Sequence, residues 1–260
     1  MAIALAPDSL TRTAAVEIRA VSKSFLVDGN AIHALQSVSL SVADGEFVSL
    51  VGPSGCGKST LLRLLAGLDA PDSGHLIEHG QPIDKPSLAR GIVFQDHRLL
   101  PWLTVEQNIM LSMKKQPLAI AQKAEITQEL ISLVGLDGFE KAHPHQLSGG
   151  MSQRAAIARG LAPNPRVLLL DEPFGALDSL TRSHLQTELL RIWEHERITM
   201  LMVTHDVEEA VYLSDRIVVM EPRPGRISRI VDVPLAKPRR RTDPAFVAIK
   251  DEILELLGVH

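Results

Sequence analysis

Short apolar runs recur along the chain, separated by stretches in which apolar residues follow a helical spacing. Four of the runs are only four or five residues long: residues 47–51, 167–170, 199–203 and 217–220. Runs of this length are typical of strands that are buried on both faces of a parallel sheet. Helical patterns over 179–196 and 207–213 fall between the later runs. This alternation predicts an α/β core with a mostly parallel sheet.

The N-terminal part of the chain has a different pattern, in which apolar and polar residues alternate as in half-buried strands. Residues 16–20 and 34–42 alternate on either side of a turn at Asp28-Gly29-Asn30. Further short strands are expected between residues 72 and 80 and over 91–94. We therefore predict an N-terminal antiparallel β part beside the core. Residues 1–13 are expected to form a disordered leader.

From about residue 96 to 163 the pattern becomes helical, which predicts a helical subdomain inserted into the core. Thr242-Asp243-Pro244 reads as a cap followed by proline at the first helical position. It predicts a last amphipathic helix with one apolar face, formed by Phe246, Ile249, Ile253 and Leu256. The predicted organisation is a main domain over residues 14–235, followed by a basic linker and this helix over 236–260.

Composition narrows the class of protein. Of the 260 residues, 45% are hydrophobic and 22% charged, as in soluble globular proteins, and no apolar run is long enough to span a membrane. The net charge of −4 argues against nucleic acid as a partner. The start of the chain lacks the basic region of a secretory signal. A single cysteine, Cys56, excludes an intrachain disulfide and suits a reducing compartment.

The strongest chemical signal directly follows the first apolar run. It reads Gly52, Pro53, Ser54, Gly55, Cys56, Gly57, Lys58, Ser59 and Thr60, and fits the phosphate-binding pattern G-x-x-x-x-G-K-[ST]. A strand before it and a helix after it are the context that the motif requires. The glycines let backbone N–H groups turn towards a phosphate. Lys58 is predicted to reach the β- and γ-phosphates, and the Ser59 hydroxyl to bind Mg²⁺.

Two acidic residues end the most apolar run. Asp171 and Glu172 follow residues 167–170, and side chains at the carboxyl end of such a strand face the crevice where α/β proteins bind ligands. We predict that Asp171 holds Mg²⁺ together with Ser59. Glu172 is the candidate general base for the water that attacks the γ-phosphate.

A second anion-binding pattern lies between these two motifs. Ser148 is a good helix N-cap, and Gly149 and Gly150 expose backbone N–H groups at the start of a predicted helix. Taken alone, this pattern is better interpreted as an ordinary glycine-containing cap. In a chain that also carries a phosphate loop, it indicates a second contact with nucleotide.

The ordered set of motifs resembles the nucleotide-binding subunit of ATP-binding-cassette (ABC) transporters. The resemblance covers about residues 16–225 and includes the phosphate loop, Gln95, residues 147–150, 167–172, Ala176-Leu177-Asp178 and His205. It implies a P-loop ATPase fold, with ATP and Mg²⁺ as ligands. It also implies a head-to-tail dimer with a second copy of the chain, in which each ATP lies between one phosphate loop and the partner's Ser148–Gly150.

The resemblance also implies individual roles. Gln95 corresponds to the glutamine that senses Mg²⁺ and the attacking water, and His205 to the histidine that touches the γ-phosphate. Asp178 corresponds to the aspartate that contacts the opposing phosphate loop. Phe25 stands where an aromatic ring stacks on adenine, although a core phenylalanine is the alternative. Met151 departs from the glutamine that usually ends the signature, so any polar contact from that position is in doubt.

Three further stretches resemble the nitrate/sulfonate/taurine branch of importers: residues 99–105, 177–182 and 204–215 with Pro224-Gly-Arg226 beyond. They predict an importer ATPase for a small anion, best matched by aliphatic sulfonates, with taurine, nitrate, a related anion or a pyrimidine precursor as alternatives. The expected partners are transmembrane permease subunits and, indirectly, a solute-binding protein, at the cytoplasmic face of the inner membrane. Residues 99–102 are either core or a docking surface for the permease.

Three questions stay open at this point. A soluble cassette protein acting in DNA repair or on ribosomes, or a small-molecule kinase, would share the phosphate loop, although the kinase leaves residues 147–150 and His205 unexplained. Residues 237–241 read as a solvated basic linker or, less simply, as a contact with anionic headgroups. Cys56 is either a reactive thiolate at a helix N-terminus or an inert residue packed under the loop.

Overall fold

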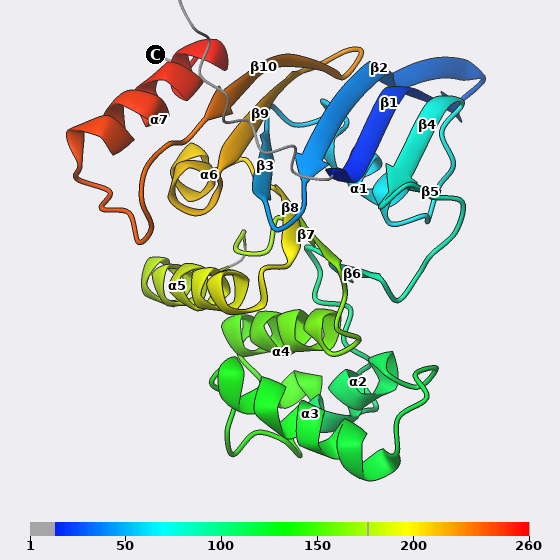
Figure 1. Ribbon diagram of the computed structural model, residues 1–260, viewed down its shortest axis with the longest axis vertical. Helices are drawn as coiled ribbons and strands as arrows, with labels where there is room; N and C mark the ends of the chain where they lie inside the picture. Colours follow the sequence, from blue (N-terminus) through cyan, green and yellow to red (C-terminus); the bar gives the residue numbers. More distant parts are fainter. Residues whose placement is uncertain (1–13, 176, 260) are drawn as a thin grey trace, which may run out of the picture.

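The computed structural model describes residues 14–175 and 177–259. The leader expected over residues 1–13, and Ala176, lie outside the described residues. Figure 1 shows a helical part, drawn in green, at one end of the molecule, and strands drawn in blue and cyan at the other. The α/β core lies between them, and the last helix packs beside it.

The core is built on a six-stranded sheet with the order β10-β9-β3-β8-β7-β6. The pairs β9-β3, β3-β8, β8-β7 and β7-β6 are parallel and only β10-β9 is antiparallel, which confirms the predicted mostly parallel sheet. Residues of β3, β7 and β8 are almost completely buried. The strands are β3 (Phe47–Val51), β6 (Arg90–Val93), β7 (Val167–Asp171), β8 (Thr199–Val203), β9 (Arg216–Glu221) and β10 (Arg226–Asp232).

A second sheet is antiparallel, as the alternating pattern predicted. Its order is β2-β1-β4-β5, and its strands are β1 (Ala14–Val27), β2 (Asn30–Ala43), β4 (Ser73–Glu78) and β5 (Gln81–Pro82). The hairpin between β1 and β2 turns at Asp28 and Gly29, both with positive φ, as a two-residue hairpin requires. Helix α1 (Lys58–Leu65) packs its leucines into one apolar cluster with side chains from both sheets, so the phosphate loop is anchored from two sides.

The helical insertion has a small core of its own. It comprises α2 (Val105–Ser112), α3 (Ile120–Leu133), the short 3-10 helix η1 (Pro144–Gln146) and α4 (Gly149–Leu161). Ile109, Met113 and Ile131 are fully buried in this core. The buried Asn108 side chain accepts from the N–H of Leu100 at 2.8 Å and donates to the carbonyl of Leu103 at 3.1 Å. This amide therefore fixes the loop before α2.

The remaining helices are α5 (Ser179–Glu196), α6 (Val207–Leu213) and α7 (Pro244–Leu256). The first two coincide with the helical patterns in the sequence. Phe246 and Ile253 of α7 are fully buried, as predicted, and Ile249 packs against the same cluster. The prediction was wrong for Leu256, which is 40% exposed. Leu257 packs against the core in its place, because it follows Ile253 by four residues and keeps a helical backbone conformation, which places it on the same face.

The prediction of a solvated linker over residues 237–241 was also wrong, because two of its cations are buried. The Lys237 ammonium lies 2.8 Å from Asp215 and 3.5 Å from the centroid of the Trp193 ring. Burial lowers the pKa of Lys237 to about 8, although Asp215 opposes the shift. We call residues 237–241 the basic strap, since it fastens α7 to the core. Charge alone could not reveal this, because lysine and arginine are usually exposed.

Arg239 is the centre of the basic strap. Its guanidinium donates to the carbonyls of Val211 at 2.5 Å, Ser214 at 2.6 Å and Val233 at 3.0 Å. Two of these carbonyls belong to the C-terminal end of α6 and the turn after it, where helix carbonyls have no partner within the helix. A cation at that end also interacts favourably with the helix dipole. Arg239 therefore caps the C-terminal end of α6 and links it to the segment that follows β10.

We predict that Arg239→Ala lowers the free energy of unfolding by about 2–4 kcal/mol, because it leaves several buried carbonyls without a donor. Urea denaturation followed by tryptophan fluorescence measures the change. Arg240→Ala is the matched control, since Arg240 is exposed in the same segment, and it should stay within about 0.5 kcal/mol of the parent. Equal stability of the two variants would contradict a structural role for the buried guanidinium.

Candidate functional site

The phosphate loop joins β3 to α1, as its sequence required. Gly57 has φ of 90° and precedes the first helical residue, Lys58, without any side-chain cap. A Cβ on Gly57 would lie 2.6 Å from the carbonyl oxygen of Ala34, so no larger residue fits there. Backbone N–H groups of the first helical turn thus stay free of side-chain acceptors, and the helix dipole adds positive potential. This end of α1 can bind an anion.

Lys58 is held against its own loop. Its ammonium donates to the carbonyls of Gly52 at 2.7 Å and Pro53 at 3.1 Å, and the side chain is almost completely buried. The charge is therefore positioned inside the curve of the loop. Cys56 is fully buried, with its sulfur 3.7 Å from the Lys58 ammonium. Burial favours the inert interpretation of this thiol over the reactive one.

The loop is supported from behind by the turn between β9 and β10. Gly225 accepts from the N–H of Gln36 at 2.9 Å and donates to the carbonyl of Ala34 at 3.1 Å. A Cβ on Gly225 would overlap the carbonyl of Cys56. Only glycine at position 225 allows this turn to pack against the phosphate loop. This contact explains the glycine in the stretch Pro224-Gly225-Arg226.

Asp171 ends β7 beside the loop. Its carboxylate accepts a hydrogen bond from the Ser59 hydroxyl at 2.9 Å, so the two predicted Mg²⁺ ligands are adjacent. Burial raises the pKa of Asp171 above its usual value, and the neighbouring Glu172 raises it further, while Ser59 and Lys58 oppose the shift. A buried carboxylate next to a second carboxylate is stabilised by a cation, which makes this pair suitable for a metal.

Glu172 brings together residues that are far apart in the sequence. Its Oε2 accepts from the Gln95 amide at 3.3 Å and lies 3.1 Å from Nδ1 of His205. Its backbone has φ of 45°, unusual for a residue with a side chain, and its N–H is held by the carbonyl of Val203 at 2.9 Å. Such strained conformations concentrate at functional sites, where surrounding structure enforces them. The three predicted catalytic residues therefore form one cluster.

The second anion-binding pattern lies elsewhere. Ser148 caps α4 in the helical insertion, accepting from the N–H of Met151 at 3.3 Å. A Cβ on Gly150 would lie 2.6 Å from the methyl group of Thr181 in α5, so the signature packs closely against that helix. Within residues 14–175 and 177–259, no hydrogen bond joins Ser148, Gly149 or Gly150 to the phosphate loop. The two predicted anion-binding stretches are therefore separate within one chain.

Asp178 and Phe25 complete the set of predicted residues. The Asp178 side chain caps α5 by accepting from the N–H groups of Leu180 and Thr181, each at 3.1 Å, and these bonds lower its pKa. It lies on the side of α5 that Gly150 approaches through Thr181. Phe25 is 39% exposed on β1, with the Lys23 ammonium 5.5 Å from its ring. The core interpretation of Phe25 was therefore wrong, and the ring is partly exposed.

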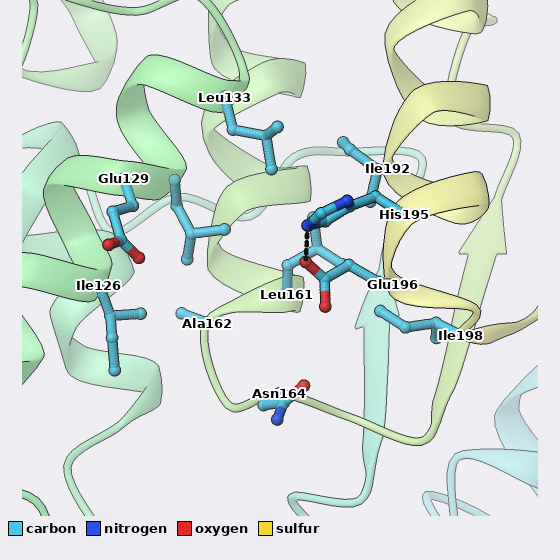
Figure 2. A pocket seen from close by; sticks show the side chains of 11 residues that line it. Ile126, Glu129, Leu133, Leu161, Ala162, Asn164, Ile192, His195, Glu196 and Ile198 are labelled. Carbon is cyan, nitrogen blue, oxygen red and sulfur yellow. Dashed lines mark ion pairs between the residues drawn. The ribbon is translucent and has the colours of Figure 1, made fainter.

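A hollow of about 390 Å³ separates the insertion from the core on another side. Figure 2 shows it between α3, the end of α4 and the C-terminal part of α5. Its walls are mainly apolar, including Ile126, Leu133 and Ile192, and its polar groups include Glu129 and the pair His195–Glu196. None of the predicted site residues lines it. It marks incomplete packing between insertion and core rather than a place for the predicted chemistry.

Among the described residues, no helix is long and apolar enough to cross a membrane. No group of three or more histidine, cysteine or carboxylate side chains is arranged to hold a metal within the described ranges.

Comparison with known proteins decides the family. The ABC transporter family model matches residues 35–175, more than half of the chain. The chain belongs to the ABC transporter ATP-binding family. The resemblance seen in the sequence is therefore confirmed, and the protein is an ABC-type ATPase with the P-loop ATPase fold.

Relatives from distant organisms extend the match over nearly the whole chain. An aliphatic sulfonates import ATP-binding protein of Bacillus cereus is 49% identical over 92% of this chain and 94% of its own length. The protein of the same name in Bacillus subtilis is 49% identical over 92% and 93%. An uncharacterized ABC transporter ATP-binding protein of Methanocaldococcus jannaschii is 48% identical over 93% and 91%.

Solved structures agree with the fold of this ABC ATPase. An ATP-binding cassette solved as a dimer in a post-hydrolysis state with ADP and phosphate has a TM-score of 0.76 and 32% identity, over 85% of this chain and all of that one. The protein cbiO1 of Clostridium perfringens, part of the ABC transporter complex cbiONQ, has a TM-score of 0.77 and 25% identity over 95% of both chains. This cassette therefore binds ATP, as its family does.

One variant tests the electrostatics of the ABC ATPase site. We predict that Asp171→Asn raises the melting temperature without nucleotide by about 2–4 °C at pH 7.5, because it removes one of two neighbouring partly buried carboxylates. In the parent, a carboxyl with a raised pKa is destabilising while ionised. As the pH falls through that raised pKa, the parent takes up a proton and the difference between the two proteins should disappear.

Scanning fluorimetry from pH 7.5 to pH 4.5, with and without MgATP, measures both effects. The same variant should lose the stabilisation by MgATP, since the predicted metal ligand is gone. Asp251→Asn, at an exposed position of α7, is the control and should behave as the parent. A variant that melts below the parent at pH 7.5 would contradict the assigned repulsion.

Proposed function

We propose that this ABC ATPase energises the import of a small anionic solute, with aliphatic sulfonates as the best candidate. Relatives named for aliphatic sulfonate import, at 48–49% identity over almost the whole chain, support this assignment. Taurine, nitrate or a related anion would use the same machinery, because a permease and a binding protein select the solute. A soluble ABC ATPase without a transport role is the alternative from another class.

The cluster around Glu172 is the observation that carries the catalytic proposal. In this mechanism Glu172 accepts a proton from the attacking water. Gln95 and His205, at 3.3 Å and 3.1 Å from Oε2, orient the carboxylate. With Nδ1 of His205 directed at Glu172, Nε2 is left to contact the γ-phosphate. Lys58 and the N–H groups of the phosphate loop stabilise the charge that develops on the phosphate oxygens.

Ser59 and Asp171 fit a bound Mg²⁺. Hydroxyl and carboxylate oxygens are the ligands that this ion prefers, and the two groups lie 2.9 Å apart at the open end of the loop. When bound, Mg²⁺ supplies charge neutralisation for the β- and γ-phosphates. Gln95 is near enough to Glu172 to sense the same ion through the attacking water. Asp171 keeps the Ser59 hydroxyl directed towards the site.

A head-to-tail homodimer accounts for the two separate anion sites. The phosphate loop would bind ATP from one side, and Ser148, Gly149 and Gly150 of the partner subunit would close the other. Asp178 caps α5 near the signature, where it would face the partner's phosphate loop. The dimeric state of a structural relative that holds ADP and phosphate supports this arrangement. Phe25, with its exposed ring, is proposed to stack on adenine.

Permease subunits are the proposed membrane partners, which would place the protein at the cytoplasmic face of the inner membrane. The loop before α2 supports this, because Trp102 is 68% exposed while Asn108 holds the surrounding backbone. A rigid loop presenting a large aromatic ring is suited to docking. The solute-binding protein would act only through the permease.

We expect Glu172→Gln to retain ATP binding and to lower turnover by about 10²–10⁴-fold, because the amide keeps the shape but accepts no proton. ATPase assays measure turnover, and calorimetry measures affinity. The variant should also accumulate as an ATP-bound dimer in size-exclusion chromatography. Glu188→Gln, on α5 in an ion pair with the exposed Arg191, is the matched control and should keep full turnover. Parent-like hydrolysis by Glu172→Gln would remove Glu172 from the role of base.

The solute is tested by uptake. A strain lacking this chain should lose the ability to take up labelled aliphatic sulfonates, and the parent gene should restore it, whereas Glu172→Gln should not. Taurine and nitrate uptake, measured in the same strain, separates the alternatives. Normal uptake of all three anions, together with no recovery of the protein on purified membranes, would favour the soluble ATPase.

A further inference from the structure

Arg182 lies between two loops that the proposed mechanism uses separately. It is the fourth residue of α5. One end of its guanidinium donates to the carbonyl of Leu177 at 3.0 Å, next to Asp178 in the chain. The other end lies 3.4 Å from the carboxylate of Asp206, next to His205. A single side chain thus spans the loop that faces the partner subunit and the loop that carries the histidine.

The second loop is held by a compact network. Asp206 caps α6, accepting from the N–H groups of Glu208 and Glu209 at 2.9 and 3.2 Å. The Thr204 hydroxyl accepts from the N–H of Asp206 at 3.0 Å and donates to the buried Glu209 carboxylate at 2.7 Å. His205 lies between two residues that are fixed in this way. Any shift of Asp206 therefore moves the imidazole relative to Glu172.

Arg182 balances the charge of that network. Its guanidinium is 3.4 Å from Asp206 and 3.8 Å from Glu209. Among the other cations near α6, Arg241 and Lys250 pair with Glu208, and Arg239 binds backbone carbonyls at the far end of the helix. Removing Arg182 would leave two carboxylates close together with no other guanidinium or ammonium paired to them among the described residues. Separate nitrogens of the planar guanidinium donate to Asp206 and to the carbonyl of Leu177, two positions that the single nitrogen of an ammonium does not occupy together.

We propose that Arg182 is a positioning residue that couples the dimer-facing loop at Leu177–Asp178 to the orientation of His205. Contact of Asp178 with the partner subunit would thereby set the geometry of the His205–Glu172 pair. Arg182 touches neither nucleotide nor water in this scheme and acts through His205. The inference rests on the ATPase dimer proposed above. It adds a physical connection within one subunit between partner contact and catalysis.

The test compares Arg182→Met with Arg191→Met, an exposed arginine on the same helix. We expect Arg182→Met to lower kcat by about 10- to 100-fold, the size of effect that a misplacement near 1 Å produces. ATP affinity by calorimetry should stay within about twofold, since the phosphate loop is untouched. Arg191→Met should match the parent in both. Arg182→Lys, which keeps the charge but not the fork, should be intermediate and covers the case in which Arg182→Met does not fold.

A double-mutant cycle separates positioning from a general loss of stability. If Arg182 acts through His205, adding Arg182→Met or Arg182→Lys to His205→Ala should change kcat by less than about twofold. Multiplicative losses would overturn the proposal, as would parent-like kcat in both Arg182 variants. A failure of the proposed function would give a different result, because His205→Ala or Glu172→Gln would then hydrolyse ATP as fast as the parent.

Discussion

Parallel pairing of four strands is the constraint on which this molecule depends. Because β3, β8, β7 and β6 run in the same direction, their carboxyl ends lie along one edge of the sheet. The phosphate loop, His205, Glu172 and Gln95 follow these strands in that spatial order. Residues separated by 77 positions, such as Gln95 and Glu172, thus come within hydrogen-bond distance. The sheet brings the candidate catalytic side chains together. Each loop therefore has to position only the few residues that follow its strand.

Much of this could be predicted because the core strands are short, apolar and buried on both faces. The same reasoning missed β10, since that edge strand is mostly exposed and carries Arg226 and Arg229. It also misjudged the basic strap, because the partners of Arg239 are backbone carbonyls, which no sequence pattern reveals. The approach of Gln95 and His205 to Glu172 was predictable in outline from the order of the strands. Its left-handed backbone and the role of Arg182 depend on contacts between distant loops.

Arginine holds irregular backbone in place at several points of this fold. Arg239 binds carbonyls at the end of α6, Arg182 binds the carbonyl of Leu177, and Arg159 donates to those of Arg98 and His97 at 2.6 and 2.7 Å. Loops at the edge of a parallel sheet carry carbonyls without strand partners. A guanidinium satisfies several of them at once and remains charged when buried. The site is consequently rigid although most of its residues lie outside helices and strands.

The position of Arg239 in the chain has a consequence for biosynthesis. The ribosome makes every strand of both sheets, and all of α6, before it reaches the strap. Until residue 239 has emerged, the carbonyls at the end of α6 lack the donor that closes them. A nascent chain therefore completes its catalytic edge late, after the phosphate loop has formed. Chaperones would meet an intermediate whose sheet is paired but whose helix α6, which follows His205, is still loosely held.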